Sequence, residues 1–158
     1  MEQAFFYIAG IPGNGCWVEL NGTEGWGDIV RALYETGLKN PDQIFCADAE
    51  SLARHFLSRY DNFDLVGYVT CREDCTWASE AAKSAYLYCF ESWDAQGFED
   101  SYAGEWDNDL ALAEDFVEST GMLHSMPDNL RGYFDMEAFT RDLMMNYSEL
   151  EGYYFRNI

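Results

Sequence analysis

The first twenty residues contain two apolar runs separated by a polar loop. The runs cover residues 4–9 and 16–20, and short runs rich in β-branched and aromatic side chains are typical of strands. The Pro, Gly and Asn residues between them favour the backbone angles of a tight connection. The pattern therefore predicts a β-hairpin.

The hydrophobic spacing then becomes helical. Apolar residues recur three and four positions apart in residues 27–37, which predicts a helix. A short apolar run over residues 44–47 predicts a strand, and a helix capped by Asp48 is expected over residues 48–60. Residues 1–60 are thus expected to form a small α+β lobe.

The middle of the chain reads as mainly helical. The pattern of residues 61–75 fits no single element, but small and aromatic residues recur at helical spacing over residues 78–93. Thr76 is a suitable N-cap for that helix. We assign residues 61–101 to a mainly helical middle lobe.

The last third repeats the mixture of helices and strands. A helix is expected over residues 109–119, Pro127 opens a short helical turn, and Asp135 caps a further helix. An apolar run over residues 152–158 predicts a closing strand. Residues 102–158 are therefore expected to form a C-terminal α+β lobe, and the whole chain an α+β protein of three small lobes.

The composition is that of a folded protein with a strong negative charge. Of 158 residues, 48% are hydrophobic and 17% are aromatic, which is too apolar for a disordered chain. The 29 acidic residues against 9 lysines and arginines give a formal net charge of −20, which repels nucleic acid and anionic membranes alike. We expect the partners to be basic protein surfaces, with no nucleic acid or membrane among them.

Neither a targeting signal nor a disulfide framework is predicted. The first twenty residues lack the basic and apolar regions of a signal peptide, and no eighteen apolar residues follow one another. Five cysteines are an odd number in a chain long enough to build its own core, so we expect reduced thiols that mostly fill the core. These features indicate a cytoplasmic protein.

Negative charge is concentrated in the second half of the chain, where no lysine or arginine occurs between Lys83 and Arg131. Residues 91–119 carry ten carboxylates: Glu91, Asp94, Glu99, Asp100, Glu105, Asp107, Asp109, Glu114, Asp115 and Glu118. The same segment also carries five aromatic residues: Trp93, Phe98, Tyr102, Trp106 and Phe116. Because a solvated acidic tail would lack these aromatic residues, the pattern predicts a folded surface of one sign.

The predicted helix over residues 109–119 separates apolar from acidic side chains. One arc of its helical wheel holds the apolar residues Leu110, Leu112, Ala113, Phe116 and Val117, and the opposite arc holds Glu114, Asp115 and Glu118. An ordinary solvated amphipathic helix gives the same wheel. Lysines four positions from the acids would normally offset the repulsion, and their absence favours selection for the negative field itself.

Carboxylates on a rigid helix can imitate the phosphates of DNA. Duplex DNA carries one negative charge per about 1.7 Å of its axis, and side chains three or four positions apart on a helix lie about 5–6 Å from one another. Rows of Asp and Glu therefore present a phosphate-like lattice to a protein that binds DNA. We interpret the ten carboxylates as the acidic surface of a DNA mimic, with no catalytic residues.

A calcium site is the first alternative for these acids. Asp107, Asp109 and Glu118 match three ligand positions of an EF-hand loop, but Leu112 stands where that loop requires glycine. The helical periodicity also continues through the segment. We therefore expect no calcium site.

Cysteine chemistry offers further alternatives. Cys71 and Cys75 resemble half of a zinc site, but no second Cys/His pair follows at metal-binding spacing. A nucleophilic pair of Cys89 with His124 stays open, although no local pattern supports it. We expect no metal, no cofactor and no enzymatic activity, and we keep a metal-dependent hydrolase and an acidic adaptor of host proteins as alternative functions.

Several segments of the chain resemble the ArdA family of antirestriction proteins. The matching segments of the last third are residues 98–106, 113–116, 120–123, Pro127, 133–135, 138–143 and 154–156. Residues 7–9, 14–15 and 17–18 are similar to the family's opening strand, loop and second strand. Residues 21–92 match only weakly.

The resemblance implies an elongated, three-lobed α+β protein that is carried on plasmids, transposons or phages and acts in the cytoplasm of a bacterial host. Such proteins mimic bent B-form DNA and occupy the DNA-binding channel of the methyltransferase core of type I restriction-modification enzymes. They thereby block restriction, modification or both. An acidic decoy for another DNA-binding target, such as a CRISPR effector or a nucleoid protein, is the alternative function.

The resemblance also implies a homodimer formed through the C-terminal lobe. The antirestriction motif of the family would fall on about residues 114–126, near that interface. Within it, Met122, Leu123 and Met126 form an apolar cluster. This cluster is either ordinary core packing or the seam of a two-fold symmetric dimer.

Overall fold

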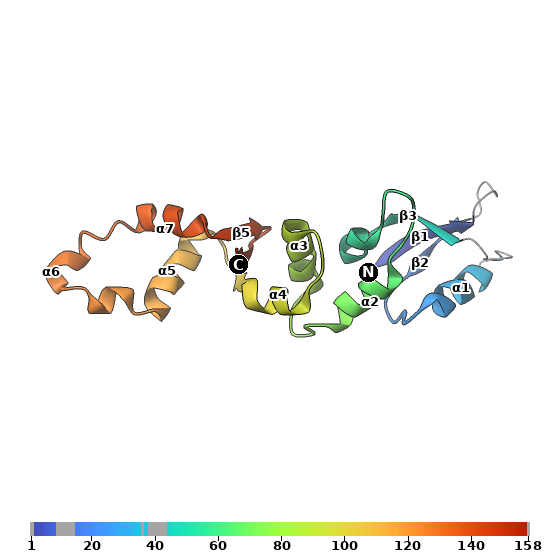
Figure 1. Ribbon diagram of the computed structural model, residues 1–158, viewed down its shortest axis with the longest axis horizontal. Helices are drawn as coiled ribbons and strands as arrows, with labels where there is room; N and C mark the ends of the chain where they lie inside the picture. Colours follow the sequence, from blue (N-terminus) through green and yellow to red (C-terminus); the bar gives the residue numbers. More distant parts are fainter. Residues whose placement is uncertain (1, 9–14, 36, 38–43, 158) are drawn as a thin grey trace. The chain divides into compact units, whose positions relative to one another are not determined.

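The computed structural model describes residues 2–8, 15–35, 37 and 44–157 (Figure 1). The chain divides into two compact units, Met1–Ala95 and Gln96–Ile158, which we call the N-terminal and C-terminal units. Each unit contains a three-stranded antiparallel sheet and several helices. The expected α+β class is therefore confirmed, whereas the elongated three-lobe arrangement stays a prediction.

The sheet of the N-terminal unit has the strand order β2-β1-β3. Its strands are β1 (Gln3–Ile8), β2 (Gly15–Glu19) and β3 (Ile44–Ala49). Strands β1 and β2 pair antiparallel, which confirms the predicted hairpin, although its loop lies outside the described residues. Side chains alternate along β1, with Ala4, Phe6 and Ile8 buried and their neighbours half-buried.

Two helical segments follow in this unit. Helix α1 (Trp26–Glu35) buries Ile29 and Leu33, as its spacing predicts. The predicted helix over residues 48–60 is wrong in extent, because the structure has a 3₁₀ helix, η1 (Ser51–Phe56), in its place.

The N-cap role predicted for Asp48 is also wrong. Asp48 belongs to β3, and its carboxylate accepts a hydrogen bond from the neighbouring Ala49 N–H. At the start of η1, the N–H groups of Leu52 and Ala53 each donate to the buried carboxylate of Glu2 at 3.1 Å. A residue fifty positions away in sequence thus takes the capping role.

Two α-helices complete the N-terminal unit. Helix α2 (Leu65–Glu73) begins at Asp64, whose side chain accepts from Gly67 N–H. Helix α3 (Glu80–Phe90) begins at Ser79, so the predicted cap Thr76 is wrong. The chain is still turning at Thr76, since Ala78 N–H donates to the Cys75 carbonyl.

The N-terminal unit has one hydrophobic core. The inner face of its sheet, α1, η1, α2 and α3 all contribute buried side chains. They are Ala4, Phe6, Ile8, Val18, Leu20, Ile29, Leu33, Cys46, Ala49, Leu52, Ala53, Phe63, Leu65, Tyr68, Cys71 and Leu87. Helices α2 and α3, predicted for a separate middle lobe, therefore share a core with the first sheet.

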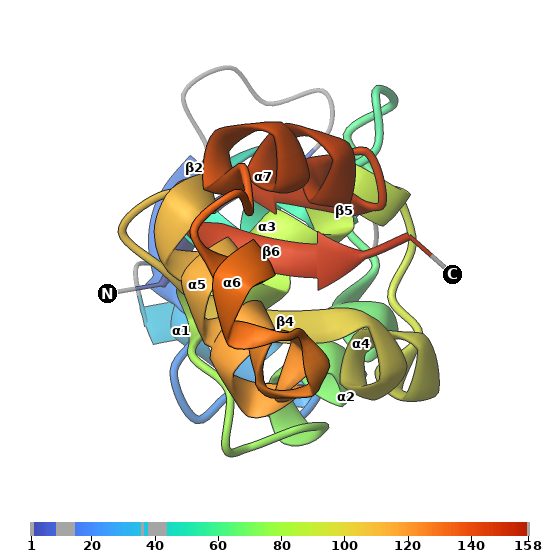
Figure 2. The ribbon, with the colours of Figure 1, turned by 90° about the vertical axis from the view of Figure 1, so that its left-hand side faces the viewer.

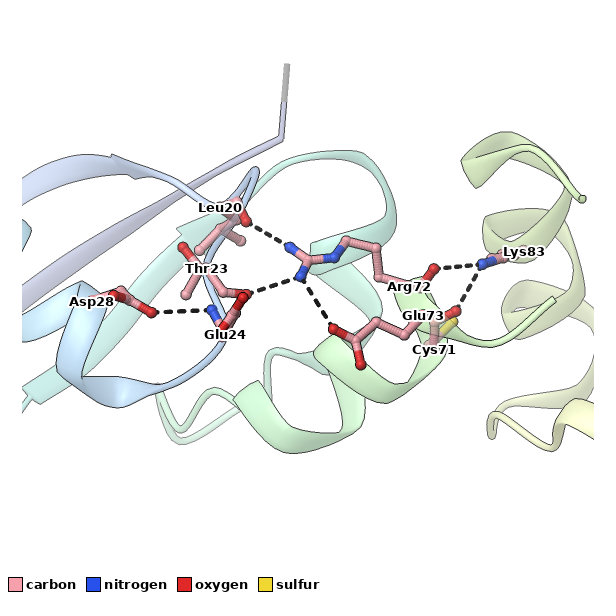
Figure 3. A network of polar contacts seen from close by, with 8 residues as sticks. All are labelled: Leu20, Thr23, Glu24, Asp28, Cys71, Arg72, Glu73 and Lys83. Carbon is pink, nitrogen blue, oxygen red and sulfur yellow. Dashed lines mark hydrogen bonds and ion pairs between the residues drawn. The ribbon is translucent and has the colours of Figure 1, made fainter. Parts of the chain in front are cut away.

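Two basic residues of this unit bind backbone carbonyls in its interior (Figure 3). Arg72 donates to the carbonyls of Leu20 and Thr23, at 2.9 and 3.0 Å. The Lys83 ammonium, only 2% exposed, donates to three carbonyls near the end of α2: those of Cys71, Arg72 and Asp74. The Lys83 ammonium is thus used inside the fold, whereas the Arg72 guanidinium also pairs with the exposed carboxylate of Glu73 at 3.8 Å.

The sheet of the C-terminal unit has the order β4-β6-β5 (Figure 2). Its strands are β4 (Tyr102–Glu105), β5 (Tyr147–Leu150) and β6 (Tyr153–Arg156). Strand β6 confirms the predicted closing strand, while β4 and β5 were not predicted. Glu151 and Gly152 join β5 to β6 with φ angles of 53° and 86°, the left-handed backbone of a tight hairpin turn.

The helices of the C-terminal unit largely follow the predicted pattern. They are α5 (Asp109–Ser119), the 3₁₀ helix η2 (Met122–Ser125), α6 (Asp128–Arg131) and α7 (Met136–Met144). Pro127 precedes α6 and the Asp135 carboxylate accepts from Ala138 N–H, so both predicted helix starts are confirmed. Helix α4 (Ala95–Ser101), at the junction of the units, was not predicted. No helix in the described ranges has the length and apolar character needed to cross a membrane.

Aromatic rings form the centre of the C-terminal unit. Phe98 and Phe155 are fully buried, and their ring centroids lie 6.0 Å apart. Tyr102 packs against both rings, at 5.2 and 5.7 Å. Because Phe98 comes from α4 and Phe155 from β6, this contact joins the two ends of the unit.

Candidate acidic surface

Eight of the ten predicted carboxylates belong to the C-terminal unit, and all eight are exposed. We call them the acidic surface: Glu99, Asp100, Glu105, Asp107, Asp109, Glu114, Asp115 and Glu118. The other two, Glu91 and Asp94, are also exposed but belong to the N-terminal unit. The structure therefore groups eight of the predicted residues in one folded unit.

The aromatic residues of the same segment are buried or half-buried. Phe98 is buried, and Trp93, Tyr102, Trp106 and Phe116 are half-buried. The Trp106 indole also donates to the Ala103 carbonyl at 3.0 Å. Exposed carboxylates beside buried and half-buried rings are the arrangement expected of a folded surface of one sign.

Helix α5 carries the densest part of the acidic surface. Leu112, Ala113 and Val117 are buried, while Glu114, Asp115 and Glu118 are exposed on the other side of the helix, as the helical wheel predicts. The Asn108 side chain accepts from Ala111 N–H and fixes the start of the helix. The three carboxylates thus stand on a rigid element.

The assignment of Leu110 to the core face of α5 is wrong. Its side chain is 42% exposed. Leu110 lies in the first turn of the helix and lines an open groove of about 690 Å³ between α5, α7, β5 and β6. Because the apolar arc ends at this position, the side chain contacts the groove rather than the core.

Three carboxylates face this groove, namely Asp109, Glu137 and Glu149. The Tyr154 hydroxyl donates to Asp109 Oδ1 at 2.7 Å, and Gly152 N–H donates to Glu149 Oε1 at 2.8 Å. These bonds restrict where the two carboxylates can point. The groove on the C-terminal unit is thus lined by three carboxylates, two of them held by hydrogen bonds, and by one cation, Arg141.

Six further carboxylates of this unit were not among the predicted site residues. They are Asp128, Asp135, Glu137, Asp142, Glu149 and Glu151, and all are exposed. For Asp128, Asp135, Glu137 and Asp142, the available signal was their position in or beside the predicted helical turn after Pro127 and the predicted helix capped by Asp135. The C-terminal unit thus displays 14 exposed carboxylates against three arginines.

The arginines leave most of the acidic surface unneutralised. Arg131 pairs with Asp128 at 2.9 Å and Arg141 with Asp142 at 3.3 Å. In the described part of the chain, no lysine or arginine forms an ion pair with Glu105, Asp107, Asp109, Glu114, Asp115 or Glu118. The negative field of these residues is weakened only by solvent and salt.

The predicted apolar cluster follows α5. Met122 and Leu123 lie in η2 and Met126 directly after it, and all three side chains are half-buried. Two exposed apolar residues lie close by in sequence and were not predicted: Leu130 in α6 and Tyr133, which is 85% exposed. The cluster thus packs partly against the unit and partly faces solvent.

The residues of the alternative calcium and nucleophile sites lie on or beside a regular helix, or in different units. Asp109 and Glu118, two of the three acids that match an EF-hand loop, lie at the two ends of helix α5, so a regular helix stands where the loop would be. Within residues 2–8, 15–35, 37 and 44–157, no three His, Cys, Asp or Glu side chains gather as metal ligands. Cys89 and His124 belong to different units.

All five cysteines lie in the described part of the chain. Cys46 and Cys71 are fully buried, and this burial raises the pKa of each thiol to about 12. Thiols with such a pKa are protonated and unreactive at neutral pH. Cys71 therefore fills the core, as predicted for most of the cysteines.

The comparisons with known proteins identify a family for the chain. None of the curated proteins compared with the chain matches it. A family model described as "Antirestriction protein (ArdA)" matches residues 7–156, which includes nearly the whole of both units. The chain belongs to the ArdA family of antirestriction proteins.

Proposed function

We propose that the chain is a DNA mimic that occupies the DNA-binding channel of a type I restriction-modification methyltransferase core. Occupation of that channel blocks restriction, modification or both. The observation that carries the proposal is the C-terminal unit, where 14 exposed carboxylates face solvent and only three arginines are present. Two of those arginines pair with Asp128 and Asp142, outside the acidic surface.

The rigidity of the carboxylates supports mimicry over simple acidity. Glu114, Asp115 and Glu118 stand on α5, which is capped by Asn108 and anchored by buried Leu112 and Val117. Side chains three or four positions apart on such a helix lie about 5–6 Å from one another, so they form a closely spaced row of negative charges, as the phosphates of DNA do. A preorganised lattice binds without the entropic cost that a disordered acidic tail would have.

A homodimer would place two acidic surfaces in one particle. We place the two-fold interface at Met122, Leu123 and Met126, together with exposed Leu130 and Tyr133. A two-fold interface applies the same surface twice, and these five apolar or aromatic residues lie within twelve positions of one another on a unit rich in carboxylates. The dimer therefore presents a longer track of carboxylates than one chain.

Competition with DNA tests the proposal directly. The purified protein is titrated into a complex of a type I methyltransferase core with labelled duplex DNA, and DNA release is measured by gel shift. We expect DNA release at micromolar protein, and an affinity that falls steeply as salt rises, in parallel with DNA. Failure to release DNA, or an affinity that does not change with salt, would contradict charge mimicry of this enzyme.

Charge-matched variants locate the contact. The triple variant Glu114→Gln, Asp115→Asn, Glu118→Gln removes three charges from α5, and we expect about tenfold weaker competition because close charge pairs with the channel are lost. The control Glu24→Gln, Glu35→Gln, Glu50→Gln removes three exposed charges from the N-terminal unit. Equal weakening by both triples would show that only total charge matters.

The identity of the target is tested with the same assay. DNA bound to a CRISPR effector and DNA bound to a nucleoid protein serve as parallel complexes. We expect the protein to release DNA from the type I enzyme at a lower concentration than from the other two complexes. Preferential release from either of the other complexes would retain mimicry but replace the target.

A further inference from the structure

The outer face of the N-terminal sheet carries four aromatic rings that the proposed function does not use. Phe5 and Tyr7 lie on the central strand β1, and pairing places Trp17 opposite Phe5 and Phe45 opposite Tyr7. The Phe5 and Trp17 centroids are 5.6 Å apart, as are those of Tyr7 and Phe45. We call these four residues the aromatic face.

The aromatic face is partly open to solvent although it stands on a sheet. Trp17 is 45% exposed and the other three rings are half-buried. The buried side chains of the same strands, such as Phe6 and Val18, point to the opposite, inner face. A contiguous exposed aromatic patch on a rigid element is typical of an interaction surface.

Two local contacts fix the rings in place. A Cβ atom at Gly15 would lie 2.5 Å from Phe5 Cζ, so the absence of a side chain there lets the Phe5 ring lie across β2. The Tyr7 hydroxyl donates to Asp61 Oδ2 at 2.6 Å. The face is therefore preorganised, and binding to it requires little ordering of its own side chains.

Carboxylates surround the rings. Glu19 ends β2 beside Trp17, Asp48 lies opposite Phe5 in the strand pairing, and Asp61 accepts from Tyr7. Among the described residues, no lysine or arginine forms an ion pair with Glu19, Asp48 or Asp61. The partner that complements this face is therefore cationic as well as able to contact aromatic rings.

Charge and shape together select the guanidinium group. Nucleic acid also stacks on aromatic rings, but a chain of net charge −20 repels it. A purely apolar partner would remove water from the surrounding carboxylates without replacing it. Arginine stacks its planar cation on aromatic faces and forms paired hydrogen bonds to carboxylates, whereas lysine offers only a compact, strongly hydrated charge.

We propose that the aromatic face binds arginine side chains of a protein partner, with Phe5, Tyr7, Trp17 and Phe45 as the stacking platform. Glu19 and Asp48 pair with the bound guanidinium groups. This contact goes beyond the proposed charge mimicry, because it belongs to the N-terminal unit and selects arginine over lysine. It also persists at salt concentrations that screen the acidic surface.

The test compares two probes of equal charge. The full chain is titrated with hexa-arginine and with hexa-lysine peptides at about 0.5 M salt, where screening extends over only a few ångströms. We expect hexa-arginine to bind at least about fivefold more tightly and to shift the NMR signal of the Trp17 indole N–H. Equal binding of the two peptides, or an unmoved Trp17 signal, overturns the proposal.

Matched variants assign the arginine preference to the face. The double variant Trp17→Thr, Phe45→Thr keeps residues that favour strands and should remove the preference. The control Trp77→Thr replaces a tryptophan that is 59% exposed outside the sheet and should keep it. A preference retained by the double variant overturns the proposal. The Trp17 signal of the wild-type chain gives an answer even where the double variant does not fold.

The carboxylates and self-association are tested in the same way. Glu19→Gln with Asp48→Asn should weaken hexa-arginine binding about fivefold, whereas Glu24→Gln with Glu35→Gln, two exposed acids of the same unit, should weaken it less. Equal weakening overturns the assignment of Glu19 and Asp48. Sedimentation of the wild type and of Trp17→Thr checks for a second copy at the face, and self-association that this variant abolishes overturns the proposed partner.

Discussion

The hydroxyl of Tyr154 lies 2.7 Å from Asp109 Oδ1 and donates a hydrogen bond to it. Tyr154 belongs to the central strand β6 and is only 3% exposed, while Asp109 is the first residue of α5. The bond therefore ties the start of the acidic helix to the sheet. It also orients a carboxylate of the acidic surface from inside the fold.

Removing this hydroxyl should destabilise the C-terminal unit. We expect Tyr154→Phe to lower the free energy of unfolding by about 1 kcal/mol, because one partly buried hydrogen bond is lost while the ring is kept. Urea unfolding followed by circular dichroism measures the change. Tyr133→Phe is the control, because Tyr133 is 85% exposed, and it should leave the stability unchanged.

The same residue predicts how stability changes at alkaline pH. Burial and the bond to Asp109 raise the pKa of Tyr154 above its ordinary value near 10. The unfolded tyrosine loses its proton near pH 10 while the folded one keeps it, so its stabilising contribution is complete below pH 10 and falls above it. Urea unfolding at pH 8 and pH 10.5 should show a smaller loss for Tyr154→Phe than for the wild type. An equal loss of unfolding free energy in the two proteins would mean that Tyr154 does not cause this pH dependence.

The interior position of Lys83 gives a second prediction. Its ammonium donates to three carbonyls near the end of α2, and its side chain is 2% exposed. Lys83→Met keeps the apolar stem but leaves these carbonyls without a donor, so we expect a loss of about 2–3 kcal/mol in unfolding free energy. Thermal and urea unfolding measure it.

The control for Lys83 is a cation at the surface. Arg54 is exposed, and Arg54→Met removes the same single charge from the same unit. It should change the unfolding free energy by less than about 0.5 kcal/mol. Similar losses in the two variants would mean that net charge, rather than capping of α2, explains the effect.

The features of the acidic surface that depend on local spacing were predictable from the sequence. The two faces of α5 follow from the helical period, and its exposed acids Glu114, Asp115 and Glu118 lie where the pattern places them. The start of α7 at Asp135 likewise depends on residues within one helical turn. Helical periodicity and N-cap residues depend only on a short stretch of sequence, so they can be recognised without knowledge of the tertiary fold.

Features that depend on distant residues were not predictable. Strand β4 has only four residues, and its partner β6 lies about fifty positions later. Glu2, just before β1, takes the cap of η1, about fifty positions later. Lys83, a residue type usually found at the surface, is buried because carbonyls near the end of α2 accept from its ammonium. These contacts join residues that only the tertiary fold brings together, so the local sequence pattern does not predict them.

The start of α3 offers a direct contrast between pattern and structure. Thr76 and Ser79 are both good N-cap residues by type, but only the Ser79 side chain accepts from a helical N–H, that of Ala82, at 3.1 Å. We expect Ser79→Ala to destabilise the N-terminal unit by about 1 kcal/mol and Thr76→Ala to have little effect. Urea unfolding compares the two variants. A larger loss in Thr76→Ala than in Ser79→Ala would place the start of α3 at Thr76, as the sequence pattern predicted.

The segment proposed as the dimer interface is held by one arginine. Arg131 Nε donates to the carbonyls of Leu123 and Met126, at 2.8 and 3.2 Å, and its guanidinium also pairs with Asp128 at 2.9 Å. These contacts fix the backbone on which the half-buried residues of the apolar cluster stand. We expect Arg131→Met to raise the dimer dissociation constant about tenfold, because an interface that must be ordered on binding is weaker than a preformed one.

Sedimentation velocity over a range of protein concentrations measures this constant. Arg156→Met is the matched control, because it removes one exposed positive charge from β6 in the same unit and so increases the repulsion between chains equally. If both variants weaken the dimer to the same extent, charge repulsion explains the loss and Arg131 has no positioning role. If Arg131→Met dimerises as the wild type does, the interface lies elsewhere, because a seam at Met122, Leu123 and Met126 depends on the backbone that Arg131 holds.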